Sequence, residues 1–160
     1  MVRVVSEVVK KIASMVRMEE TYATSLSASV EWLGNVVVRE ILRSIAYDSH
    51  KHAGFYTAIL NLLQGGSPAI FESDYDRLEA VLKKHIEVED KMIQDVKQLI
   101  ETERDNRVRH LMTEIYQDEV RHHALMRRLL ESVIKRETIF EEDVWDMLWK
   151  DVPGHGAPIS

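Results

Sequence analysis

The chain has 160 residues, of which 45% are hydrophobic and 30% charged, so a soluble globular domain with a full core is expected. Its formal net charge is −6 and its basic residues form only short runs, which argues against a nucleic-acid-binding surface. It has no cysteine, which excludes disulfides, thiolate catalysis, iron–sulfur clusters and thiolate zinc sites. Valine alternates with charged residues at the amino terminus, giving neither a signal peptide nor a spanning helix, so we expect a cytoplasmic protein without a membrane partner.

The first half of the chain reads as two long helices. Prolines occur only at positions 68, 153 and 158, so long stretches run without a helix breaker. Apolar residues at helical spacing predict a first helix over about 4–31 and a second over about 36–63. The turn between them falls at Gly34-Asn35, and the cluster Gly65-Gly66-Ser67-Pro68 ends the second helix.

The second half repeats this pattern. A crossover over 64–74 leads to a third helix, which has Asp74 as its expected N-cap and continues to about Glu103. A polar turn follows at 104–106, and the fourth helix covers about 107–136.

A fifth, short helix over about 138–149 is predicted because Thr138 and Glu141 resemble a capping box. Residues 151–160 form an irregular tail. The predicted fold is therefore all-α: an antiparallel four-helix bundle of two helix hairpins joined by a crossover, plus the fifth helix, in one domain over 1–150. The four-helix core occupies about 4–136.

The fourth predicted helix carries Glu119 and His122 three residues apart, so both side chains project from one face. A carboxylate and an imidazole in a helical core need a partner, and a metal ion is a common one. One Glu-x-x-His pair is weak evidence by itself, because many charged helices contain one by chance. The apolar residues that share this face predict that it is the buried one: Leu111, Ile115, Leu125 and Leu129.

An internal repeat strengthens the metal hypothesis. An offset of 70 residues pairs polar positions of the two halves: Glu19 with Glu89, Asp48 with Asp118, Ser49 with Glu119, and His52 with His122. Each half thus has a helix with an inward carboxylate, followed by a helix with an Asp-x-x-x-His motif. Copies of one sequence should adopt copies of one hairpin, so we expect the two hairpins to be related by an approximate twofold.

With these motifs, residues 1 to about 136 resemble the ferritin-like superfamily, and specifically the small rubrerythrin-like di-iron carboxylate proteins. The resemblance implies two bound metal ions. Iron is the expected metal, with manganese or zinc as alternatives. Asp48 and Asp118 would accept the free N–H of a histidine and fix its tautomer. The implied ligands are two bridging carboxylates, one terminal carboxylate and two imidazoles: Glu19 and Glu89, Glu119, and His52 and His122.

Ser49 departs from this pattern, because a second terminal glutamate is expected at its position. A hydroxyl is a poor ligand for Fe(II) or Mn(II), so the ion nearest His52 should bind more weakly and recruit water, Asp48 or Glu20. His85, four residues before Glu89, is a further candidate ligand. Glu20 is also an alternative to Glu19 in the first helix, although the apolar neighbours favour Glu19.

These residues could instead form a hydrogen-bonded polar layer in a bundle core. That explanation is favoured for any single residue. For the whole set a metal is favoured, because burying so many unpaired polar groups would be strongly destabilising. The other histidines His50, His110 and His123 are predicted to be solvated.

The leading functional hypothesis is a metal-binding oxidoreductase, a rubrerythrin-like peroxidase or oxidase that reduces peroxide or dioxygen. It would need an external electron donor, since a chain without cysteine holds no rubredoxin-type centre. The alternative is a metal-free or mononuclear bundle that serves as a binding or assembly module, and iron storage is a third choice. A homodimer is expected because large apolar residues gather at one end: Trp32, Phe140, Trp145, Met147 and Trp149. The alternative is that the fifth helix caps its own bundle with these residues.

Overall fold

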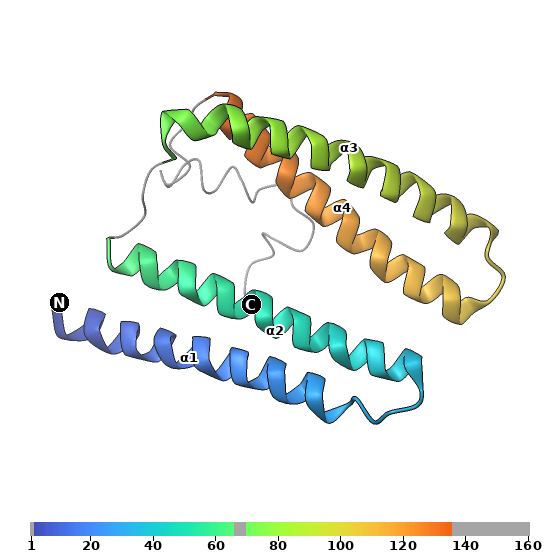
Figure 1. Cartoon of the computed structure of the whole chain (residues 1–160), viewed down its shortest axis with the longest axis horizontal. Helices are drawn as coiled ribbons and strands as arrows, with labels where there is room; N and C mark the ends of the chain where they lie inside the picture. Colours follow the sequence, from blue (N-terminus) through green and yellow to red (C-terminus); the bar gives the residue numbers. More distant parts are fainter. Residues whose placement is uncertain (1, 66–69, 136–160) are drawn as a thin grey trace, which may run out of the picture. The chain divides into compact units, whose positions relative to one another are not determined.

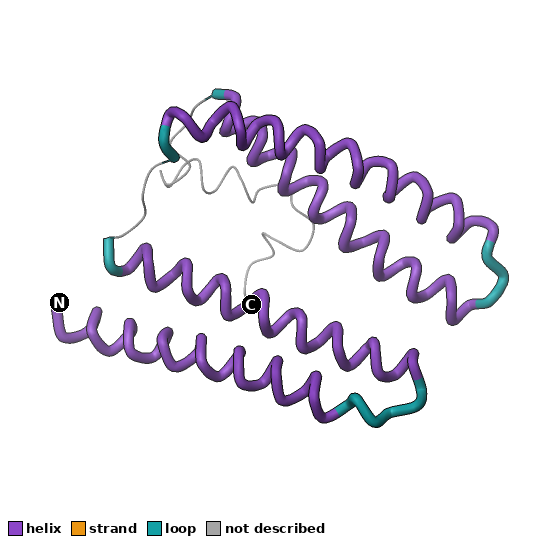
Figure 2. Tube along the Cα trace, viewed as in Figure 1, coloured by secondary structure: helices purple, strands orange, loops and turns teal. Residues whose placement is uncertain are grey.

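The computed structural model describes residues 2–65 and 70–135. They form four helices: α1 (Val2–Ser29), α2 (Val36–Leu63), α3 (Glu72–Thr102) and α4 (Asn106–Ile134). Helices are the only regular secondary structure in these two ranges, as Figure 2 shows, so the predicted all-α class with four long helices is confirmed. The predicted fifth helix over 138–149 and the tail over 151–160 lie outside the described residues.

The helices pair in sequence order. α1 lies beside α2, and α3 lies beside α4 (Figure 1). The chain divides into two compact units, Met1–Pro68 and Ala69–Ser160, and each unit contains one antiparallel hairpin. A single domain over 1–150 stays a prediction. Within the described ranges, no helix has the length and apolar character needed to cross a membrane.

The starts of the helices show the same 70-residue offset as the repeat in the sequence. α3 begins 70 residues after α1, and α4 begins 70 residues after α2. The pairing of helices in sequence order also agrees with two copies of one hairpin. The approximate twofold between the copies stays a prediction.

Asparagine and aspartate side chains begin the second helix of each hairpin. Asn35 Oδ1 accepts a hydrogen bond from the Val38 N–H at 3.2 Å, and Asp105 Oδ1 accepts one from the Arg107 N–H at 2.9 Å. These bonds satisfy backbone donors that have no partner inside the helix. After α2, Gly65 adopts φ +71°, a left-handed conformation that glycine enters without strain.

The expectation that Asp74 caps α3 is wrong. The N-cap is Phe71, which makes no side-chain capping bond, and the helix begins at Glu72. Glu72 and Asp74 both lie in the first turn, where negative charges interact favourably with the positive end of the helix dipole. Asp74 therefore stabilises the start of α3 as a residue of its first turn and not as its N-cap.

Small residues form the seam between α1 and α2. On α2 the side chains of Ala46, Ser49 and Ala53 are 1%, 6% and 3% exposed. Their spacing of three and four residues places them on one helix face, and Ala23 of α1 is also buried. Short side chains allow two helices to approach closely, so this seam has little room for a larger group.

The α3–α4 hairpin packs through larger side chains. Leu82 and Val133 are buried at its core. Partly buried apolar residues surround them: Ile70, Tyr75, Leu78, Met126, Leu129 and Leu130. The hairpins therefore share their layout but differ in how their helices pack.

Candidate metal centre

Three side chains of the α3–α4 hairpin come together: Glu89 from α3, and Glu119 and His122 from α4. Each offers one ligand atom, and the three atoms lie within 4.8 Å of one another. The two carboxylates are half-buried and His122 is exposed. Glu119 and His122 project together because residues three apart lie on the same side of a helix. The structure thus gathers the predicted ligands of the second half, and their binding of a metal ion stays a prediction.

The environment of Glu89 favours a nearby cation. Burial raises the pKa of its carboxyl above the ordinary value, and the charge of Glu119 raises it further. The charges of His122, His123 and His85 oppose this increase. Two carboxylates held close in a partly dry position repel each other, and a bound cation would relieve that repulsion.

Both helices of this hairpin carry a buried polar atom without a partner. Among the described residues, two buried side-chain atoms lack a hydrogen-bond partner, Glu89 Oε2 and His123 Nε2. Buried polar atoms nearly always have a partner, so this pair marks a point where the protein alone leaves bonding unsatisfied. Carboxylate and imidazole groups are common ligands for iron, manganese and zinc ions, so the donor set fits a metal.

His123 corrects a sequence-based expectation. The sequence predicts a solvated histidine, but the side chain is half-buried and its Nε2 is fully enclosed. His50 and His110 are exposed, as predicted. The sequence signal that bears on His123 is the repeat, because the residue 70 positions earlier is the small apolar Ala53, which the structure then shows to be buried.

The α1–α2 hairpin holds a smaller polar set. Glu19 Oε1 lies 3.7 Å from His52 Nδ1, and the two side chains are 20% and 49% exposed. This distance is longer than a hydrogen bond, so the two groups are neighbours without a direct bond. Glu20 is exposed, which agrees with the preference for Glu19.

The remaining candidate residues, Asp48, Asp118 and His85, are not part of the group of three ligand atoms. Asp48 forms an ion pair with Lys51, and Asp118 forms one with Arg121 at 2.6 Å. Both aspartates are exposed and bind cations of their own helix, and neither shows the expected bond to a histidine. His85 is exposed, yet its charge acts on Glu89. Glu19 and His52 belong to one compact unit and the α3–α4 ligands to the other, so a single site shared by them stays a prediction.

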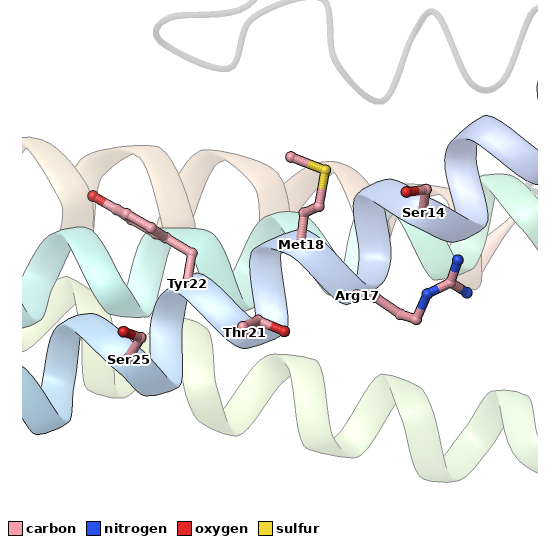
Figure 3. A pocket seen from close by; sticks show the side chains of 6 residues that line it. All are labelled: Ser14, Arg17, Met18, Thr21, Tyr22 and Ser25. Atoms are coloured by element: carbon pink, nitrogen blue, oxygen red, sulfur yellow. The ribbon is translucent and has the colours of Figure 1, made fainter.

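A groove along α1 is a separate feature (Figure 3). Its described lining residues follow one face of α1 at helical spacing: Ser14, Arg17, Met18, Thr21, Tyr22 and Ser25. None of them is a predicted ligand, and the set contains no carboxylate or imidazole. The groove therefore does not compete with the α3–α4 cluster as a metal site.

Antiparallel helix hairpins with carboxylate and imidazole groups at repeated positions define a helical protein with a candidate carboxylate metal site. The chain belongs to the rubrerythrin family, whose model matches residues 17–130. The matched range includes all five predicted ligands, Glu19, His52, Glu89, Glu119 and His122. The resemblance inferred from the motifs is thereby confirmed. Searches of curated proteins and of solved structures gave no significant match.

Proposed function

We propose that this chain is a ferritin-like metalloprotein that binds two metal ions and reduces peroxide or dioxygen. Iron is the preferred metal in this proposal. The observation that carries the proposal is the convergence of Glu89, Glu119 and His122 within 4.8 Å. Membership of the rubrerythrin family supports it, because the matched residues include the predicted ligands of both hairpins.

The protein's own residues have distinct tasks in this proposal. Glu89, Glu119 and His122 hold an ion at α3–α4, and Glu19 with His52 supplies ligands from α1–α2. Two ferrous ions bound there would supply one electron each, which with two protons would reduce one hydrogen peroxide to two water molecules. An external donor returns the electrons.

Peroxide titration of the iron-loaded protein tests this function. We expect anaerobically loaded protein to consume one peroxide per two ferrous ions, without the hydroxyl radical that free ferrous iron releases. Glu119→Gln and His122→Ala should lose this stoichiometry, because each removes one ligand of the α3–α4 cluster. Iron oxidation and spin trapping are measured together.

His110→Ala is the matched control, since His110 is an exposed histidine of the same helix. It should behave as the unmodified chain does. The proposal fails if the unmodified protein consumes peroxide with the stoichiometry and radical yield of free iron.

A mononuclear protein is the second candidate, and the burial of Ser49 favours it. The expected carboxylate of the α1–α2 half is replaced by a hydroxyl at 6% exposure in the helix seam. With only Glu19 and His52 in that half, one ion per chain would bind at Glu89, Glu119 and His122. Such a chain would take up one ion and would not show the paired-ion peroxide stoichiometry.

A further inference from the structure

His123 is the residue of this centre to which the proposed function gives no role. It lies on α4, its side chain is half-buried, and its Nε2 is buried without a hydrogen-bond partner. An imidazole nitrogen in that position has lost its hydration and gained no bond, which destabilises the folded protein. Its presence there requires either a packing role or a partner that the ion-bound state supplies.

The internal repeat argues against a packing role. The residue 70 positions earlier is Ala53, which is 3% exposed in the seam of the α1–α2 hairpin. The first hairpin therefore forms with a methyl group at this position. The same contrast recurs one turn earlier, where Ser49 corresponds to Glu119. The second hairpin has polar groups where the first needs only small ones.

The complementary partner lies on the paired helix. Glu89 Oε2 of α3 is the other buried atom without a hydrogen bond in the described residues, and α3 lies beside α4. His123 lies one helical turn after Glu119, whose ligand atom is within 4.8 Å of that of Glu89, so the His123 side chain projects from the same side of α4. A carboxylate oxygen accepts a hydrogen bond and an imidazole N–H donates one, so the two atoms can satisfy each other.

Direct metal binding by His123 is disfavoured by geometry. The group of three ligand atoms within 4.8 Å includes His122 and does not include His123. Adjacent helix residues diverge by about 100°, so His122 and His123 cannot easily reach the same ion.

We propose that His123 is a positioning residue of the metal centre. When an ion is bound, its Nε2–H donates a hydrogen bond to Glu89 Oε2, and this bond holds the carboxylate in the orientation that binds the ion; in the structure neither atom has a partner. This inference rests on the proposed function, because it requires an ion at Glu89. Hydrogen bonds from outside the ligand set raise metal affinity by restricting how a ligand turns.

Cobalt(II) titration of the metal-free full chain tests the inference, with the visible absorption bands as the readout. His123→Phe removes the donor and keeps a ring of similar size. We expect the Kd for Co(II) to rise by about 10- to 100-fold with unchanged band positions. His123→Gln places an amide donor there and should recover part of the affinity. The metal-free His123→Phe protein should keep or raise its Tm, because a buried nitrogen without a partner has been removed.

The controls separate the outcomes. His110→Phe changes an exposed histidine of the same helix and should leave the Kd unchanged. His123→Ala, which introduces the residue type found at Ala53, replaces the phenylalanine variant if that variant does not fold. An unchanged Kd in these variants overturns the positioning role, and shifted bands overturn it in favour of direct ligation. Absence of Co(II) binding by the unmodified chain overturns the proposed metal site as well, and so is distinguishable from failure of the His123 inference alone.

Discussion

Ser49 is the residue whose surroundings most limit the metal site of the α1–α2 hairpin. Its side chain shares one buried helix face with Ala46 and Ala53. A carboxylate at this position has to enter a seam built for small side chains. The serine is therefore consistent with both the close helix packing and a weaker ion position near His52.

Ser49→Glu should lower the stability of the metal-free protein while raising its capacity for metal. Burying a carboxylate without a partner should cost about 1–3 kcal/mol in the free energy of unfolding. Added Fe(II) or Mn(II) should recover part of this loss if the carboxylate reaches an ion, and the metal stoichiometry should move toward two per chain. Chemical denaturation with and without metal measures the first effect, and elemental analysis measures the second.

Ser49→Ala is the control, because it keeps the small volume and should change neither stability nor stoichiometry substantially. Equal stability of Ser49→Glu and the unmodified protein, with no gain in metal, would mean that position 49 has no connection with the site.

The separate positions of His122 and His123 show what one helix pattern can predict. The spacing of Glu119 and His122, with the apolar residues around them, predicts their shared face. His123 lies next to this stripe, and its burial depends on how α4 packs against α3. The periodicity of a single helix does not contain that information. The burial of His123 is seen only when α4 is packed against α3, and the burial of Ala53 at the matching position of the repeat is likewise seen only in the structure.

At the scale of the elements, the helix ends follow from short sequence signals. The predicted range of α2, 36–63, agrees with the structure, because Asn35 caps its start and glycines follow its end. The starts of α1 and α3 fall before their predicted positions, at Val2 and Glu72. The start of α3 has no side-chain capping bond that marks one residue, and its first turn holds two acidic residues, Glu72 and Asp74.

Asp105 makes the start of α4 sensitive to acid. Its carboxylate accepts hydrogen bonds from the Arg107 backbone at 2.9 Å and from the Arg107 guanidinium at 2.6 Å, which hold the pKa of Asp105 well below its usual range. A pKa that is lower in the folded state stabilises the fold above the unfolded pKa of about 4 and loses this effect as the pH falls further.

Asp105→Asn should therefore lower the Tm at pH 7, and its difference from the unmodified chain should shrink as the pH falls below about 4. Asparagine remains a good N-cap, so the variant removes mainly the charge interaction with Arg107. Thermal unfolding of both proteins from pH 7 to pH 2 measures the difference. A Tm difference that stays constant over this range would rule out the ionised carboxylate as its cause.

At the scale of the whole molecule, the two hairpins share a layout and differ in their polar content. The first has a seam of alanines and one serine, with Glu19 and His52 as neighbours 3.7 Å apart. The second has Glu89, Glu119 and His122 gathered as a cluster. The repeat is visible in the sequence because paired polar residues keep a constant offset, while the difference in packing becomes visible only in the structure.

Each hairpin by itself also leaves apolar side chains exposed. On α2 these lie away from the seam with α1: Ile41, Ile45, Phe55, Ile59 and Leu62. Neighbouring exposed apolar side chains on one helix are typical of a surface that takes part in an interaction. The sequence predicts that this face is apolar, but one helix pattern cannot identify the surface that covers it.

Metal content of the purified protein tests the central claim most directly. The protein is purified without chelators or a metal-affinity tag, loaded with Fe(II), Mn(II) or Zn(II), desalted, and analysed for metal per chain. We predict at least one retained ion in the unmodified chain and the loss of that ion in Glu119→Gln, while His110→Ala keeps it. If the unmodified chain retains none of these metals, or Glu119→Gln retains as much as the unmodified chain does, Glu89, Glu119 and His122 do not form the metal site.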